Sequence, residues 1–189
     1  MGKIVQVKES GGIVGAVEYT LAHPRDSKQR GIRHLASNVF IFKDSSLTEI
    51  LLTKRNLDMN RGGKINVCIG GHNDWLDYSN KGEKSIETAL RELKEEVFYN
   101  NTLPPELDNL QFISAFPKNL RANDLEIVSL YTGIYSGPFY KNPFEVSDIF
   151  FETIPNVKTD IIKNPEKYVK SAELYLDHLC FFMQTTTKI

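Results

Sequence analysis

The sequence predicts an α/β (α+β) protein in which a mixed β-sheet carries helices on both of its faces. Segments rich in β-branched and aromatic residues interleave along the chain with segments of helical periodicity. They do so without a strict strand–helix–strand rhythm, and no internal repeat is visible. A chain of 189 residues with 41% hydrophobic residues can bury one core without staples, so we expect a single domain over residues 1–189.

The composition excludes several classes of protein. No run approaches the ~18 apolar residues of a membrane span, and the first residues lack the apolar core of a secretory signal. A net charge of −1 and a pI near 6.4 argue against a nucleic-acid partner. The two cysteines, Cys68 and Cys180, fit reduced thiols. We expect a cytoplasmic protein with no membrane partner, and we leave a homodimer open.

The first third of the chain predicts three strands. Residues 1–33 are interpreted as an N-terminal extension or hairpin. The run HLASNVFIF that follows is dense in β-branched and aromatic residues, as a buried strand requires. The expected strands cover residues 34–42, 49–54 and 65–69, the last of them ended by a turn at Gly70 and Gly71.

A helix is expected next, with Ser85 as its N-cap and Glu87 near the positive end of its dipole. The rest of the chain mixes strand and helix signals. Further strands are expected at residues 111–116, 125–135 and 145–151, with a loop at 117–124 and a C-terminal helical segment at 157–189 that is broken at Asn164 and Pro165.

Five charged residues, one just before the expected helix and four within it, have a spacing that makes a metal site. The pattern is E-x7-R-E-U-x-E-E, with U apolar, and it is formed by Glu83, Arg91, Glu92, Glu95 and Glu96. At about 100° per residue, the last three glutamates share one arc of the helix while apolar residues fill another. Their repulsion weakens the helix unless a cation offsets it, and carboxylate oxygens suit Mg²⁺ or Mn²⁺. The alternative is a solvated helix face, but the fixed offsets favour the metal site.

This segment resembles the box of the Nudix family, G-x5-E-x7-R-E-U-x-E-E-x-G-U, whose members mostly hydrolyse nucleoside diphosphates linked to another group. The second half of the box is complete. The counterpart of the opening glycine is Gly71, which eleven residues rather than five separate from Glu83, an insertion of six. Phe98 replaces the later glycine, so we expect the left-handed residue after the helix at Asn100 or Asn101. The resemblance implies a Nudix-type α/β/α sandwich with a mixed sheet.

The chain also resembles the Nudix subgroup that includes isopentenyl diphosphate isomerase. That family has a histidine directly before its first core strand, like His34, and another just after the strand that precedes the box, like His72. It also has an acid-x-acid pair entering a late strand, like Asp124 and Glu126. For the two histidines the alternative is an ordinary polar residue at a strand end, and for His23 that interpretation is favoured.

The departures from the isomerase are equally specific. The isomerase needs a cysteine directly before its Gly-His pair, whereas here Gly70 precedes Gly71 and His72. The thiol of Cys68 lies two residues earlier. Isomerases also commonly degrade the R-E-U-x-E-E motif, which is complete in this chain.

The resulting hypothesis is Mg²⁺- or Mn²⁺-dependent hydrolysis of a diphosphate bond in a small, nucleotide-like substrate. The expected metal ligands are Glu92, Glu95 and Glu96. Glu83 is expected either to join them as a ligand through water or to steady the start of the helix. The resemblance implies that Arg91 orients a box carboxylate and that Glu126 is a metal ligand or general base, so the expected catalytic residues are Glu92, Glu95, Glu96, Arg91 and Glu126. Substrate binding is expected of Lys54, Arg55, Gly70, Gly71 and His72. The alternatives are an isopentenyl diphosphate isomerase-like enzyme and a non-catalytic module that binds a nucleotide.

Overall fold

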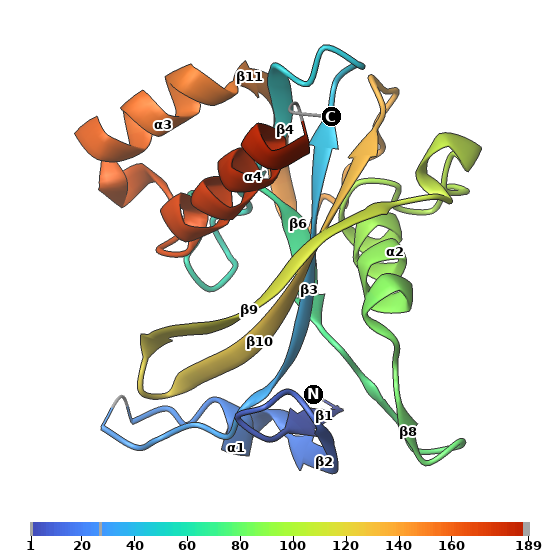
Figure 1. The fold of residues 1–189 in the computed structure, drawn as a ribbon, viewed down its shortest axis with the longest axis vertical. Helices are drawn as coiled ribbons and strands as arrows, with labels where there is room; N and C mark the ends of the chain where they lie inside the picture. Colours follow the sequence, from blue (N-terminus) through green and yellow to red (C-terminus); the bar gives the residue numbers. More distant parts are fainter. Residues whose placement is uncertain (1, 27, 187–189) are drawn as a thin grey trace.

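The computed structural model describes residues 2–26 and 28–186, which are built around one mixed β-sheet (Figure 1). Its central strand, β3 (His34–Phe42), pairs in parallel with β10 (Asp124–Ile134) and antiparallel with β6 (Ile69–His72). The sheet also contains β1 (Lys3–Val7), β2 (Ile13–Glu18), β4 (Glu49–Arg55), β5 (Ile65–Asn66), β9 (Gln111–Arg121) and β11 (Val146–Thr153). Outside this sheet lie the short pair β7 (Trp75–Leu76) and β8 (Lys81–Gly82), the helices α1 (Tyr19–Ala22), α2 (Ser85–Glu96), α3 (Ile154–Lys163) and α4 (Ala172–Thr186), and the 3₁₀ turns η1 (Pro105–Leu107) and η2 (Pro165–Lys167).

Helices cover both faces of the sheet, so the predicted α/β/α sandwich is confirmed (Figure 1). On the α2 face, Val39 and Ile41 of β3 belong to one apolar cluster. On the α3 and α4 face, Phe40 and Phe42 belong to another. Successive side chains of a strand point to opposite faces, so β3 supplies both halves of the core.

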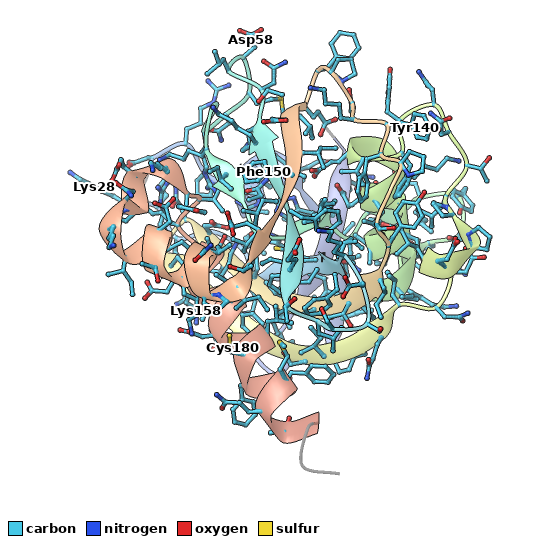
Figure 2. The ribbon with its side chains drawn as sticks, turned by 90° about the horizontal axis from the view of Figure 1, so that it is seen from above. Lys28, Asp58, Tyr140, Phe150, Lys158 and Cys180 are labelled. Atoms are coloured by element: carbon cyan, nitrogen blue, oxygen red, sulfur yellow. The ribbon has the colours of Figure 1, made fainter. Side chains whose placement is uncertain are left out.

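The helices α3 and α4 pack against each other on their face of the sheet. Lys158 Nζ of α3 lies 3.8 Å from Cys180 Sγ of α4 (Figure 2). Cys68 and Cys180 are both free thiols. Among the described residues, no helix is long and apolar enough to cross a membrane.

The N-terminal segment adds a hairpin at one end of β3. β1 and β2 pair antiparallel, and β1 joins the sheet through Gln6, which pairs with His34. Figure 1 shows this hairpin and α1 beside the N-terminal end of β3, near the turn that joins β9 to β10. His23 follows directly after α1, which ends at Ala22. Its ring lies beside that of His34, with the two ring centroids 4.5 Å apart.

The expected turn at Gly70 and Gly71 is wrong. Both glycines lie within β6, where they pair with Asn38 and Ser37 of β3. A Cβ atom on Gly70 would meet the carbonyl oxygen of Ser37 at 2.2 Å. Close approach of two backbones, rather than turn geometry, therefore requires glycine at this position. The preceding strand, expected to end at residue 69, is divided into β5 and β6.

The expected loop at residues 117–124 is also wrong, because β9 and β10 continue through it as one long hairpin. The turn takes residues 122–123. Pro117 pairs with Ile127, and β9 tolerates a proline because it is an edge strand, bonded to β10 alone. The longer hairpin places Lys118 opposite Glu126.

The ends of α2 differ in part from expectation. The N-cap is Lys84, not Ser85, and its backbone N–H donates to Glu87 Oε2 at 3.1 Å. The Ser85 hydroxyl instead accepts a hydrogen bond from Ser129 at 3.2 Å. After the helix, Asn100 has a φ of 59°, so the left-handed residue expected at one of the two asparagines is confirmed at the first.

Candidate metal and diphosphate site

The carboxylate of Glu92 on α2 lies against the backbone of β6. A Cβ atom on Gly71 would meet Glu92 Oε1 at 2.3 Å, so glycine leaves room for the carboxylate beside the strand. The next residue, His72, points to the other face of β6, where its ring contacts those of His23 and His34. Two neighbouring residues of β6 therefore face two different groups of side chains.

Arg91 ties three carboxylates of the box together. Its guanidinium donates to Glu92 Oε1 at 2.8 Å, to Glu95 Oε2 at 3.0 Å and to Glu83 Oε2 at 3.1 Å. It also donates to the carbonyl oxygen of His72 at 3.0 Å. A planar guanidinium with five donors suits such a set of contacts, and its charge holds together carboxylates that would otherwise repel.

Glu83 is buried, and contacts within the fold take up most of its carboxylate. Besides the bond from Arg91, it accepts the Thr88 hydroxyl at 2.8 Å and the Asp74 N–H at 3.3 Å. These contacts link the insertion before the helix to the first turn of α2. Of the two roles expected for Glu83, they favour steadying the helix start.

Glu92 and Glu96 are the box carboxylates whose pKa values burial raises. Burial raises the pKa of Glu96 to about 8, and the charges of Glu92 and Glu145 add to the effect. Burial also raises the pKa of Glu92 to about 7, against the opposing charge of Arg91. A divalent cation would remove much of this cost, and carboxylate oxygens are its preferred ligands. The oxygen ligands of these two residues and the exposed Glu95 suit Mg²⁺ or Mn²⁺ in kind, but among the described residues the three carboxylates do not form a group at metal-ligand spacing.

Replacing Arg91 with Lys is expected to lower kcat more than it lowers the free energy of unfolding. Lysine keeps the charge but loses the fork that contacts three carboxylates and the His72 carbonyl at once. We expect a drop of roughly ten- to a hundredfold, as for other residues that orient metal ligands. Steady-state kinetics beside a urea titration would measure both quantities, and full kcat in the variant would remove Arg91 from the site.

A second group of side chains, here called the histidine cluster, lies on the opposite face of β6. Its members are His23, His34, His72, Asp124 and Glu126. Glu126 Oε1 lies 3.6 Å from His72 Nε2 and 4.0 Å from His34 Nε2. Asp124 Oδ1 lies 3.7 Å from His23 Nδ1, and the Nε2 atoms of His23 and His72 are 3.1 Å apart.

Two of the imidazoles in the histidine cluster, His23 and His34, offer unshared electron pairs rather than positive charge. Burial lowers the pKa of His23 to about 3 and that of His34 to about 4, and the neighbouring histidines add to the effect, so both rings are neutral at pH 7. His34 Nδ1 donates to the Ile32 carbonyl at 2.8 Å, which leaves His34 Nε2 as the acceptor atom, and this atom has no hydrogen-bond partner among the described residues. Asp124 Oδ1 is likewise buried without a hydrogen-bond partner in the described part of the chain. Neutral imidazoles beside carboxylates fit a transition metal such as Zn²⁺ or Mn²⁺.

Two members of this region were missed in the sequence. His23 was interpreted as an ordinary histidine, but the N-terminal hairpin and α1 bring it to the cluster. Lys118 was placed in the loop expected at residues 117–124 and not beside Glu126. Its ammonium lies 2.6 Å from Glu126 Oε2. The strand pairing of β9 with β10 would have been the signal for Lys118, whereas no local pattern marks His23.

The other predicted residues divide between the site and the surface. Arg55 lies at the end of β4, where its charge acts on Glu96, and its Nε donates to the Asn60 carbonyl at 3.0 Å. Lys54 is exposed, and within the described part of the chain it has no ion pair. Cys68 is buried with its Sγ 3.6 Å from Asn38 Oδ1, and burial raises the pKa of the thiol far above its ordinary value.

No protein-family model matches the chain. The chain is 25% identical over 171 residues to an isopentenyl-diphosphate Delta-isomerase of Aliivibrio fischeri (strain MJ11), covering 87% of each protein. It is 26% identical over 156 residues to an isopentenyl-diphosphate Delta-isomerase of Dinoroseobacter shibae, covering 80% of this chain and 81% of that protein.

Solved structures resemble the fold over most of its length. A crystal structure of DR0079 from Deinococcus radiodurans has a TM-score of 0.71 at 17% identity, covering 93% of this chain and 97% of that one. A MutT NUDIX hydrolase from Burkholderia pseudomallei has a TM-score of 0.56 at 18% identity, covering 77% and 97%. The NUDIX domain of Shewanella oneidensis NrtR, complexed with ADP ribose, has a TM-score of 0.56 at 18% identity, covering 82% and 88%. The chain thus has the Nudix fold, and its sequence is similar to the isopentenyl diphosphate isomerases within that fold.

Proposed function

We propose that the protein is a Mg²⁺-dependent hydrolase that cleaves a diphosphate bond in a small nucleoside-diphosphate-linked or similar substrate. The observation that carries the proposal is the buried carboxylate of Glu96 beside the partly buried carboxylate of Glu92, because a bound cation would offset the repulsion and burial that raise their pKa values. The complete set of contacts around Arg91 supports it. The ADP ribose in the NUDIX domain of Shewanella oneidensis NrtR supports the nucleotide class of substrate.

Each residue has a role in this proposal. Glu92, Glu95 and Glu96 hold Mg²⁺ or Mn²⁺, and Arg91 orients Glu92 and Glu95 towards it. A divalent ion at this place neutralises diphosphate charge and lowers the pKa of a water molecule. The histidine cluster, with Glu126 as one ligand, holds a second ion. The two free thiols support a reducing, cytoplasmic location.

A labelling experiment tests the reaction. The purified protein is incubated with Mg²⁺ and a panel of nucleoside-diphosphate-linked compounds and isoprenoid diphosphates in ¹⁸O-labelled water. Hydrolysis breaks one P–O bond and joins a water oxygen to phosphorus, so one ¹⁸O atom per cleavage should appear in a phosphate product. Turnover without ¹⁸O in any phosphate, or no turnover on the panel, would contradict the hydrolase.

The second candidate is an isopentenyl diphosphate isomerase-like enzyme. The histidine cluster and the similarity to two isomerases over at least four fifths of the chain favour it. Gly70 stands directly before Gly71 and His72, where that reaction needs a thiol. Cys68, the nearest thiol in the sequence, is buried against Asn38. Isomerisation in D₂O would place deuterium on carbon and leave the diphosphate intact, so the same panel separates the two reactions.

Cys68→Ser is expected to keep diphosphate hydrolysis within about twofold. The proposed hydrolysis has no step that needs sulfur, and a serine hydroxyl can still donate to Asn38 Oδ1 at this position. We expect the free energy of unfolding to fall by less than about 2 kcal/mol. Kinetics and a urea titration check both numbers. An inactive but folded variant, in a protein that interconverts isopentenyl and dimethylallyl diphosphates, would replace the hydrolase with the isomerase.

A further inference from the structure

Lys118 brings a buried ammonium group to the edge of the histidine cluster. Its side chain is 7% exposed, and it lies opposite Glu126 in the pairing of β9 with β10. Its Nζ atom is 2.6 Å from Glu126 Oε2 and 3.8 Å from Asp124 Oδ2. A buried cation so close to candidate metal ligands either takes the place of the metal or prepares its ligands.

The oxygen atoms of the two carboxylates divide between cations and histidines. Glu126 turns Oε2 to Lys118, which leaves Oε1 towards His72 and His34. Asp124 turns Oδ2 to Lys118 and to Arg61, 3.9 Å away, which leaves Oδ1 towards His23. Each carboxylate therefore presents one oxygen to the imidazole nitrogens while a cation holds the other.

These positions place the ammonium outside the group of ligands rather than at its centre. An ammonium in the position of the metal would donate to the histidine nitrogens, because each of its three protons needs an acceptor. Yet His34 Nε2 and Asp124 Oδ1 have no hydrogen-bond partner within residues 2–26 and 28–186. The contacts of Lys118 are to the oxygen atoms that face away from the histidines.

We propose that Lys118 is a positioning residue, which turns Glu126 Oε1 and Asp124 Oδ1 towards His23, His34 and His72 and thereby sets the metal affinity of the histidine cluster. Groups that hydrogen-bond to metal ligands fix the orientation of those ligands, and their loss typically costs ten- to a hundredfold in metal affinity. The proposal rests on the second ion of the proposed function. It does not depend on the reaction at the box.

Titration with Co²⁺ alone tests the role of Lys118. Co²⁺ is chosen because its visible absorption reports the ligands that surround it. The titration is made in a Glu96→Gln background, which weakens binding at the box, and a further His34→Ala substitution identifies the signal of the histidine cluster. The variants are Lys118→Met, Lys118→Gln and, as a matched control, Arg121→Met, which removes an exposed cation from the same strand.

A positioning role predicts an order among the variants. Lys118→Met should lower the Co²⁺ affinity by about ten- to a hundredfold, while Arg121→Met changes it less than about twofold. Lys118→Gln, which can still donate to Glu126 Oε2, should lie between Lys118→Met and the parent protein. Circular dichroism establishes that each variant is folded. If Lys118→Met does not fold, the same order between Lys118→Gln and the parent decides the question.

A rise in Co²⁺ affinity is expected if the Lys118 ammonium occupies the position of the metal. If the ammonium took the place of the metal, its removal would free two carboxylates, and the Co²⁺ affinity would rise in Lys118→Met and Lys118→Gln. An unchanged or higher Co²⁺ affinity in the Lys118 variants overturns the proposal. The proposal also fails if His34→Ala leaves the Co²⁺ signal of the parent protein unchanged. A protein that binds Co²⁺ as expected but hydrolyses no diphosphate would refute the proposed function while supporting the role of Lys118.

Discussion

Glu96→Gln is expected to lower kcat/KM for diphosphate hydrolysis by about a thousandfold, because it removes the most buried carboxylate of the box helix. A metal ion supplies several kcal/mol of charge stabilisation in the transition state, and about 4 kcal/mol corresponds to a factor of a thousand. Mn²⁺ affinity should fall in parallel, as measured by isothermal titration calorimetry. Glu95→Gln should lose affinity too, although Glu95 is exposed and contacts Arg91.

The stability of Glu96→Gln distinguishes this site from a structural ion pair. The glutamine relieves repulsion from Glu92 and Glu145, so the metal-free variant should be at least as stable as the parent at pH 8. Loss of a structural salt bridge would lower stability instead. Glu87→Gln, on the exposed first turn of the same helix, is the matched control and should keep full activity. Unchanged Mn²⁺ affinity and turnover in Glu96→Gln would return the acidic cluster to a solvated helix face.

The metal-free protein is expected to lose about 2 kcal/mol of stability between pH 6.5 and pH 8. In this range the folded protein still binds protons at Glu96, whose pKa is raised to about 8, and in part at Glu92, whose pKa is raised to about 7. The unfolded chain, in which both have their ordinary pKa of 4.5, has already released them. Since the folded state binds more protons, stability falls as the pH rises through this window.

Below pH 6.5 a second effect has the opposite sign. His23 and His34 have lowered pKa values, so the unfolded chain binds protons there that the folded protein does not, and this effect opposes that of Glu92 and Glu96, which begins above their ordinary pKa of 4.5. The metal-free protein should therefore be most stable near about pH 5.5, where the two effects balance. Urea titrations with a chelator at several pH values measure this profile. Saturating Mg²⁺ should reduce the fall in the free energy of unfolding between pH 6.5 and pH 8, and so should Glu96→Gln in a separate experiment. If the metal-free parent shows no fall in this range, the raised pKa values are contradicted.

The box could be predicted from the sequence because its geometry is local. A helix converts fixed offsets into fixed directions, so the spacing of Arg91 and Glu92 to Glu96 places them on one face of α2 before any tertiary contact is known. The α/β/α fold class was predictable for a similar reason, since strand and helix periodicities survive in the sequence.

The histidine cluster could be predicted only in part because non-local pairings assemble it. His34 and His72 were noticed through their place beside expected strands, but His23 reaches them through a hairpin whose register no local pattern specifies. Lys118 depends on the register of β9 with β10, and that register could not be predicted while residues 117–124 were expected to form a loop that begins at Pro117. Edge strands tolerate proline, and edge position is a property of the complete sheet.

The alternation along β6 constrains how this protein can change. Gly71 leaves space for Glu92 on one face, and His72 joins the histidine cluster on the other. Insertion or deletion of a single residue upstream within β6 would exchange the two directions, pressing an imidazole against the box helix and leaving a glycine where a ligand is needed. Substitutions in this strand can damage one centre at a time, whereas a change in its length would disable both together. The length of β6 is therefore under a tighter constraint than the identity of any one of its side chains.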